Sequence, residues 1–363
     1  MKPIDRVLGC LQRKKIDKIP KDFSSSDEII EKLKRHFKIE GDESYGNPLI
    51  KCIDARILDA LSCDLRMVAP SYVGPEIKIE SDGSWVNLFG IKRRPIKTDY
   101  GIYYSYEGTP LKNALNSDVD NYDWPKAEWF DYSSIEFQCE KFKDYAIVAG
   151  YPGNVDFLNK TATLVGMEEL LIGLAKNKAY ILKIFDKLAE FFYEYNSRIL
   201  KISKGRIHIA YFGDDYGSQS DLLISPKMYE DIIYPRFKVF YELAKSYGCY
   251  IMHHSCGSVA KLIPYLIQAG VDILDVVQPY ISFMDLEELK EKYGAEIAFH
   301  GAICVQKLLP SQEVNKIESE VRRIISILAK GGGYIMSPTN KIGPDVPLEN
   351  ILLIYKTADY FNI

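Results

Sequence analysis

The strongest chemical signal in this 363-residue sequence is the stretch MHHSCGS, in which a histidine and a cysteine stand two residues apart. His254 and Cys256 follow an apolar run that predicts a β-strand, and residues two apart along a strand can point to the same side. An imidazole nitrogen and a thiolate sulfur are both ligands that Zn²⁺ accepts. We interpret the pair as candidate zinc ligands; the alternative is a hydrogen-bonded core histidine beside a small buried thiol.

Three aspartates are the candidate catalytic carboxylates. Asp214 and Asp215 end the preceding predicted strand, in YFGDDYGSQ. Adjacent carboxylates there can bind a cation, transfer protons or orient a ligand, although helix capping would use the same residues. Asp64, in SCDLRMV, is expected at the end of another strand beside Arg66, where it is either catalytic or half of a salt bridge.

Other polar side chains are expected at strand ends, where they would line a ligand pocket rather than a sealed rim. The candidate substrate-binding residues are Tyr151, Asn154, Gln219, Gln278, His300 and Asn340. Cys304, four residues after His300, is a candidate third zinc ligand, with Asp215 as the other choice.

The elements that would position these residues form a regular pattern. Apolar, β-branched runs alternate with segments of helical periodicity, which predicts a parallel sheet wrapped by helices. Eight runs fit a single (β/α)8 barrel covering residues 1–363, whose active site would lie at the carboxyl ends of the strands. The runs are Ile19–Phe23, Leu61–Val68, Tyr145–Gly150, Arg206–Phe212, Cys249–His253, Val271–Val276, Glu296–His300 and Gly333–Ser337.

Two helices and one insertion can be placed between these runs. Apolar stripes from Ile181 to Ile199 and from Val314 to Leu328 predict helices packed on the barrel. Ser25 and Glu28 have the spacing of a capping box after the first strand. Roughly from Ala69 to Gln138, aromatics mix with Gly, Asp and Pro at turn spacing, which predicts a β-rich insertion (residues 69–140) between the second and third strands.

Composition excludes several classes of protein. A net charge of −4 provides no basic footprint for nucleic acid. No apolar stretch is long enough to span a bilayer, and the first residues lack the apolar core of a signal peptide. Seven cysteines without a compact framework of spacings favour reduced thiols, so we expect a cytoplasmic protein.

The succession of strand-end motifs resembles the uroporphyrinogen decarboxylase superfamily over nearly the whole chain. The resemblance rests on RVLGCLQRKKIDKIP, AGYPGN, FGDDYGSQ, HHSCGSVAKLIPYLIQAGVDILDVVQP, HGAICVQ and SPTNKIGPDVPLENI. It implies the (β/α)8 barrel, and the H-x-C of His254 and Cys256 is similar to the methyltransferase branch. That branch implies Zn²⁺, a corrinoid (cobalamin) carried by a partner protein, a small-molecule or thiol methyl donor or acceptor, and a homodimer.

Two departures from the family pattern keep alternatives open. The last strand ends in Asn340, where the methyltransferases usually place a third cysteine ligand and the decarboxylases a histidine. The arginine-rich substrate motif of the decarboxylases is missing, since the first strand continues as IPKDFSSS, although Asp64 resembles their central aspartate. We expect methyl transfer at a zinc site; the alternatives are a decarboxylase acting on a tetrapyrrole through Asp64, and a non-catalytic tetrapyrrole-binding relative.

Overall fold

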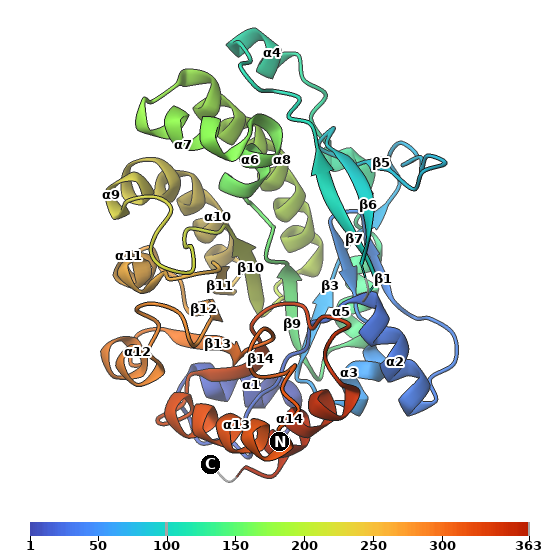
Figure 1. The fold of residues 1–363 in the computed structure, drawn as a ribbon, viewed down its shortest axis with the longest axis vertical. Helices are drawn as coiled ribbons and strands as arrows, with labels where there is room; N and C mark the ends of the chain where they lie inside the picture. Colours follow the sequence, from blue (N-terminus) through green and yellow to red (C-terminus); the bar gives the residue numbers. More distant parts are fainter. Residues whose placement is uncertain (99–100, 362–363) are drawn as a thin grey trace.

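The barrel sheet is parallel and curved, and helices cover its outer face (Figure 1). The computed structural model describes residues 1–98 and 101–361. Seven strands follow one another in the order β3-β9-β10-β11-β12-β13-β14, all paired in parallel. Their bounds are β3 Leu65–Val68, β9 Ala146–Gly150, β10 Ile209–Gly213, β11 Tyr250–His254, β12 Ile273–Val277, β13 Ala298–Ile303 and β14 Tyr334–Pro338.

The expected first strand closes the barrel as a short bridge rather than a full strand. Lys21 forms an isolated parallel bridge with Met336 of β14. The N–H of Asp22 donates to the Met336 carbonyl (2.9 Å), and the N–H of Asp64 donates to the Lys21 carbonyl (2.8 Å), so this segment lies between β14 and β3. Pro20 has no N–H to donate, which helps to keep the pairing short. The predicted (β/α)8 barrel is confirmed, with this segment in the eighth position.

Helices alternate with the strands, and the two predicted apolar stripes are α8 and α13. The predicted capping box is wrong: α2 begins at Asp27 after Ser26, which caps nothing, and the Ser25 hydroxyl donates to the Ser26 carbonyl.

Within the described residues, no helix has the length and apolarity that crossing a membrane requires. The helices are α1 Pro3–Leu11, α2 Asp27–Phe37, α3 Ala55–Ala60, α4 Asn116–Asp120, α5 Ser134–Lys141, α6 Leu158–Val165, α7 Met167–Ala175, α8 Ala179–Ser203, α9 Pro226–Met228, α10 Tyr234–Ser246, α11 Ile263–Gln268, α12 Leu286–Tyr293, α13 Val314–Leu328 and α14 Leu348–Asp359, with short turns η1 Ala127–Trp129, η2 Tyr229–Ile233 and η3 Ala260–Leu262.

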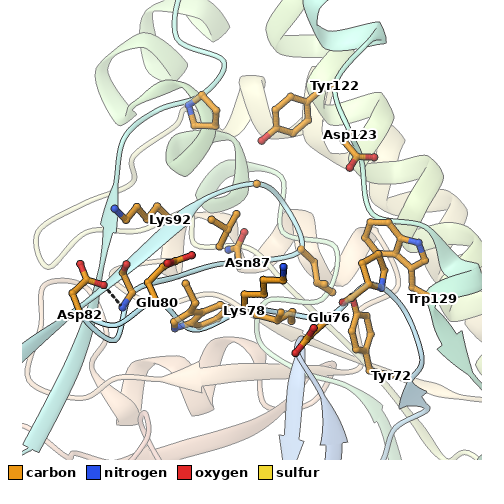
Figure 2. Close-up of a pocket in the computed structure, with 18 of the residues that line it drawn as sticks. Tyr72, Glu76, Lys78, Glu80, Asp82, Asn87, Lys92, Tyr122, Asp123 and Trp129 are labelled. Carbon is orange, nitrogen blue, oxygen red and sulfur yellow. Dashed lines mark hydrogen bonds between the residues drawn. The ribbon is translucent and has the colours of Figure 1, made fainter.

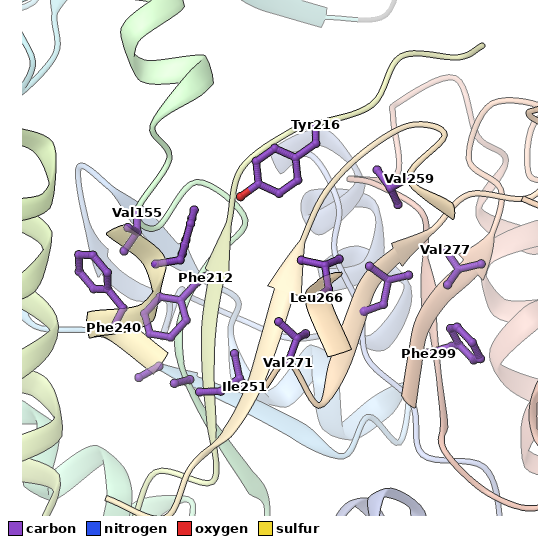
Figure 3. Packing of buried hydrophobic residues seen from close by; sticks show 14 of the residues in the cluster. Val155, Phe212, Tyr216, Phe240, Ile251, Val259, Leu266, Val271, Val277 and Phe299 are labelled. Atoms are coloured by element: carbon purple, nitrogen blue, oxygen red, sulfur yellow. The ribbon is translucent and has the colours of Figure 1, made fainter. Parts of the chain in front are cut away.

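Alternate residues of each strand face opposite sides, which gives the barrel two apolar layers. Met252 of β11 and Ile273 of β12 belong to the inner layer, and Val7 of α1 packs with them. On the outer side, Phe212 of β10 packs against Phe240 of α10, with ring centroids 6.0 Å apart, and Figure 3 shows this layer extending to Phe299 of β13. The same alternation decides which polar side chains reach the barrel interior.

The β-rich insertion lies between β3 and β9. Its base is the antiparallel pair β4 Ser71–Tyr72 and β8 Phe130–Asp131. Its tip is a three-stranded sheet of β5 Trp85–Val86, β6 Lys92–Thr98 and β7 Gly101–Glu107, with residues 99–100 outside the described part. The ring of Phe89 packs on Phe191 and Phe192 of α8, with centroids 6.0 and 6.1 Å away. A separate hairpin, β1 Tyr45–Asn47 with β2 Ile50–Cys52, precedes α3.

Candidate metal centre

Three potential metal ligands meet where β10 and β11 end. His254 is the last residue of β11, Cys256 follows two residues later, and Asp215 stands two residues after the end of β10. One donor atom from each lies within 4.8 Å of the other two. Nε2 of His254 is 3.3 Å from Sγ of Cys256 and 3.5 Å from Oδ1 of Asp215. An oxygen, a nitrogen and a sulfur therefore converge on one small volume.

The two loops that carry these donors are bonded to each other. The N–H of Asp214 donates to the carbonyl of His254 (3.0 Å), and the N–H of Cys256 donates to Oδ1 of Asp215 (2.8 Å). Farther along, Gly217 and Gly257 are so close that a Cβ on Gly257 would lie 2.4 Å from the backbone carbon of Gly217. Gly257 also has a φ of +90°, so both its conformation and its surroundings favour glycine. The Asp215 loop and the Cys256 loop are thus held in a fixed relation.

Each of two ligands has a sequence neighbour that points away from the site and into the outer layer. Tyr216, next to Asp215, stacks on His253, next to His254, with centroids 5.5 Å apart and an interplanar angle of 9°. Nδ1 of His253 is 2.8 Å from the hydroxyl of Tyr241. Burial lowers the pKa of His253 to about 3, which keeps its ring neutral. This stack ties β10 and β11 together behind the ligands.

The imidazole of His254 is oriented by a buried carboxylate. Asp275, in the middle of β12, faces the barrel interior and places Oδ2 2.5 Å from Nδ1 of His254. Its Oδ1 is 2.5 Å from Nδ1 of His300, and the hydroxyl of Tyr211 donates to Oδ2, the oxygen that His254 also contacts. On the other side of His300, Nε2 is 3.1 Å from Oδ2 of Asp22. Nε2 of His254 is therefore left facing Asp215 and Cys256.

Opposite charges set the protonation states in this chain of contacts. Burial alone would lower the pKa of His254 and of His300, but the Asp275 carboxylate and the other anions outweigh it. The pKa of His254 is raised well above its usual value, and that of His300 is raised to about 9. Burial also disfavours charge on Asp275, yet the two imidazoles hold its pKa below the ordinary range. For Asp215, the bonds from His254 and the Cys256 N–H likewise outweigh burial and lower the pKa. The site consequently carries anionic oxygens beside protonated rings.

Asp214 has a structural environment. Its carboxylate accepts hydrogen bonds from the N–H groups of Phe157 (3.1 Å) and Leu158 (2.9 Å), at the start of α6. Burial, followed by the neighbouring carboxyl of Asp156, raises its pKa well above the ordinary value. Of the two adjacent aspartates, Asp214 therefore holds the start of α6, and Asp215 joins the candidate ligands.

The predicted position of Asp64 is wrong. The run Leu61–Val68 is not one strand: α3 ends at Ala60, β3 begins at Leu65, and Asp64 precedes the strand at its amino end. Its carboxylate pairs with the guanidinium of Arg6, and its Oδ2 accepts from the Lys21 N–H (2.9 Å). Because strand ends of opposite polarity face opposite mouths of a barrel, Asp64 lies at the other end from His254.

The prediction of Cys304 as third ligand is also corrected. Cys304 follows the end of β13 but packs in the outer apolar layer, and its Sγ accepts from the Lys307 N–H at 3.3 Å. In the described part of the chain it does not join the group formed by the three candidate ligands. Asp215, the other predicted choice, occupies that place.

Two of the predicted pocket residues support the backbone instead. Gln278 accepts the N–H of Gly257 through Oε1 (2.6 Å), which fixes the loop that follows Cys256. Asn154 is buried, donates through Nδ2 to the carbonyl of Tyr211 in β10 (2.9 Å), and exchanges amide hydrogen bonds with Asn196 of α8 at 3.0 and 3.1 Å.

The remaining predicted pocket residues have diverse positions. Tyr151 is half-buried, and within the described residues its hydroxyl has no hydrogen-bond partner. Gln219 and Asn340 are exposed, and Oδ1 of Asn340 accepts the N–H of Lys341. Of the six, only His300 is bonded to the carboxylate that orients His254.

Sequence reasoning missed Asp275, Tyr211, Asp22 and Asn159. Nδ2 of Asn159 donates to Oδ2 of Asp215 (2.9 Å), so it holds the oxygen that does not face His254. A usable signal existed for Asp275: it is a lone acid inside the apolar strand ILDVV, two residues from the inward-facing Ile273. A charged residue at an inward position of a buried strand needs a partner.

Comparisons with known proteins agree with this architecture. Residues 160–361, which include all three candidate ligands, match the family model described as uroporphyrinogen decarboxylase (URO-D). A methylated-thiol--coenzyme M methyltransferase of Methanosarcina mazei is 26% identical over 144 residues, which is 40% of this chain and 35% of the relative. The match thus spans about a third of that relative's length.

The solved structures extend the likeness to the whole fold. A methyltransferase from Methanosarcina mazei superposes with a TM-score of 0.66 at 18% identity, covering 99% of this chain and 98% of that chain. A D-psicose 3-epimerase from Clostridium cellulolyticum H10 reaches a TM-score of only 0.40 at 11% identity, over 68% of this chain and 86% of that chain. The first of these likenesses supports the fold from end to end.

Proposed function

The chain belongs to the uroporphyrinogen decarboxylase family, and we propose that within it this protein is a zinc-dependent methyltransferase. The observation that carries the proposal is the convergence of Asp215, His254 and Cys256, whose donor atoms lie within 4.8 Å of one another. The three sit where a (β/α)8 barrel places its reaction centre.

The donor set fits zinc. Zn²⁺ is bound by sulfur, nitrogen and oxygen donors, and catalytic sites combine three protein ligands with one open position. A carboxylate hydrogen-bonded to the far nitrogen of a histidine ligand is a recurrent feature of such sites, and Asp275 stands in that position behind His254. When bound, zinc would act as a Lewis acid that favours the deprotonated form of a thiol.

The chain's own residues would prepare the site for this chemistry. Asp275 holds a proton on Nδ1 of His254, so that Nε2 is the nitrogen that would release its proton and bind a metal. Asn159 restrains the Asp215 carboxylate from the other side. At His300, a proton on Nε2 would be held against Oδ2 of Asp22, whose side chain is 17% exposed. This pair offers an acid or base beside the reaction centre.

The substrates proposed are a methylated small molecule or thiol and a corrinoid protein that docks over the barrel mouth. Support comes from the H-x-C resemblance and from the curated relative, whose name specifies a methylated thiol and a methyltransferase. The cytoplasmic location and the homodimer remain predictions.

Element analysis together with methyl transfer from methylcobalamin to a thiol tests the proposal. We expect about one zinc per chain and a thiol-dependent change in the visible spectrum of methylcobalamin, both lost in Cys256→Ala. Cys304→Ala is the matched control, because its thiol packs in the outer layer and should leave both readouts intact. Zinc-free protein, or equal turnover in the two variants, would refute the zinc mechanism.

The decarboxylase alternative loses its proposed carboxylate. Asp64 was the residue expected to act on a tetrapyrrole, and it is paired with Arg6 at the opposite end of the barrel. Release of CO₂ from a porphyrinogen by the purified protein would restore that alternative. Saturable corrinoid binding without any turnover would favour a non-catalytic relative.

A further inference from the structure

The insertion contains a cavity of about 990 Å³ that the barrel chemistry does not use (Figure 2). All the residues that line it lie between Tyr72 and Trp129, outside the region 160–361 that matches the family. Its size is that of a small-molecule site. The cavity therefore lies outside the part of this chain that the family model matches.

Four aromatic side chains line the cavity, and each is held by neighbours. Gly74 lets the rings of Tyr72 and Trp129 approach, because a Cβ there would lie 2.6 Å from the Cβ of Trp129 and 2.8 Å from the Tyr72 ring. The hydroxyl of Tyr122 donates to the carbonyl of Phe89 (2.7 Å). Trp85 packs edge-on against Tyr104, with centroids 6.2 Å apart. All four lining rings are half-buried, so part of each remains open to a ligand.

Carboxylates outnumber ammonium groups around these rings. Glu76, Glu80, Asp82 and Asp123 line the cavity, and within the described residues none of them forms an ion pair. The lining includes two lysines, Lys78 and Lys92, and Nζ of Lys92 is 3.4 Å from Oε2 of Glu107, which lies outside the lining. Figure 2 shows the Glu80 carboxylate and the Lys78 side chain extending into the same space as the rings. The charge balance of the walls is negative.

We propose that this cavity binds an organic cation of the alkylammonium or quaternary ammonium class. Aromatic faces attract such cations through their quadrupoles, and nearby carboxylates add a long-range attraction. A phosphate or polycarboxylate ligand would instead meet four carboxylates against two lysines, one of which is already paired with Glu107. The inference goes beyond the proposed methyl transfer and does not depend on zinc, since no lining residue belongs to the metal centre.

Calorimetric titration with choline and with its neutral isostere 3,3-dimethylbutan-1-ol tests the proposal, at constant ionic strength. We expect saturable 1:1 binding of choline, with the isostere bound at least about fivefold more weakly because it lacks the charge. Absence of saturable choline binding, or equal binding of the two compounds, would overturn the proposal.

Variants locate the site. Trp129→Leu should weaken choline binding at least about fivefold while Trp129→Phe retains most of it. Glu80→Gln, an exposed change that does not threaten folding, should weaken binding as well, and Glu288→Gln on α12 is its matched control. Binding should persist in Cys256→Ala, so a failure of the zinc proposal leaves this one standing. Unchanged affinity in both Trp129→Leu and Glu80→Gln would show that choline binds elsewhere and would refute the assignment.

Discussion

The two ends of the barrel each bury an aspartate, but they use it differently. At the amino end, Asp64 and Arg6 face each other, and Oδ1 of Asp17 accepts from Nε of Arg6 (2.7 Å), so one guanidinium pairs with both carboxylates. At the carboxyl end, Asp275 binds the far side of His254 and leaves Nε2 beside the other donors. A buried carboxylate paired with a cation contributes to the fold, whereas one that orients a ligand prepares chemistry.

The largest expected effect tests the amino end. Asp64→Asn removes the buried carboxylate that faces Arg6 and leaves the guanidinium only the part-exposed Asp17, so it should lower the free energy of unfolding by about 3–5 kcal/mol. Denaturant titration measures this loss, with the exposed Asp5→Asn as control. Zinc affinity should not change in the folded protein, and a parallel loss of metal would mean that the two ends are coupled.

The next effect tests the carboxyl end. Four ligands share roughly 10–16 kcal/mol in small structural zinc sites, so losing the sulfur in Cys256→Ala should weaken zinc binding roughly a hundredfold to a thousandfold. Competition with a chromophoric chelator gives the affinity, and Cys304→Ala should match the wild-type chain. If both variants lose metal equally, Asp215 and Cys304 have been assigned the wrong way round.

A smaller loss is expected from the residue behind the ligand. Asp275→Asn keeps the size of the side chain but weakens the contact that orients His254, and outer partners of this kind are worth about 10–100-fold in metal affinity. When Co²⁺ replaces zinc in both proteins, the visible absorption bands of Asp275→Asn should also be shifted from those of the wild type. A loss of stability alone would not shift them. Unaltered affinity and spectrum would reduce Asp275 to a structural role like that of Asp64.

The last prediction concerns His300, whose effect is spread over a range of pH. Its pKa is about 9 in the folded protein against about 6.5 in an unfolded chain, so its stabilising contribution is fully present below about pH 6.5 and is lost as the pH rises to about 9. In zinc-free protein the slope should approach about 1.4 kcal/mol per pH unit for this one group. His300→Gln should flatten the profile of unfolding free energy against pH, without abolishing the part due to His254. An identical slope in the variant would contradict the pairing with Asp275.

Much of the fold was predictable because strand and helix periodicities differ. The apolar stripes of α8 and α13 and the order of strands required only the alternation of buried residues. Strand bounds were less accurate: β3 begins at Leu65 rather than Leu61, because the buried apolar residues Leu61 and Cys63 of the turn after α3 adjoin the strand in sequence. That error of four residues moved Asp64 to the wrong end of the barrel.

The site was predictable only in part. His254 and Cys256 are neighbours in sequence, so their spacing gave a direct signal. Asp215 could be proposed but not chosen over Cys304, because the choice depends on which loop reaches across to β11. The network through Asp275, Tyr211 and Asp22 joins three strand positions far apart in the chain, and no local pattern in the sequence connects them.

The pairing of β4 with β8 has a consequence for how this chain can be altered. Ser71 opposes Asp131 and Tyr72 opposes Phe130, so the two ends of the β-rich insertion lie side by side where it joins the barrel. Because these two ends are adjacent, residues 73–129 could be replaced by another domain in a chimera while β4 and β8 stay paired. The replacement domain would have to cover Phe191 and Phe192, on which Phe89 of the native insertion packs.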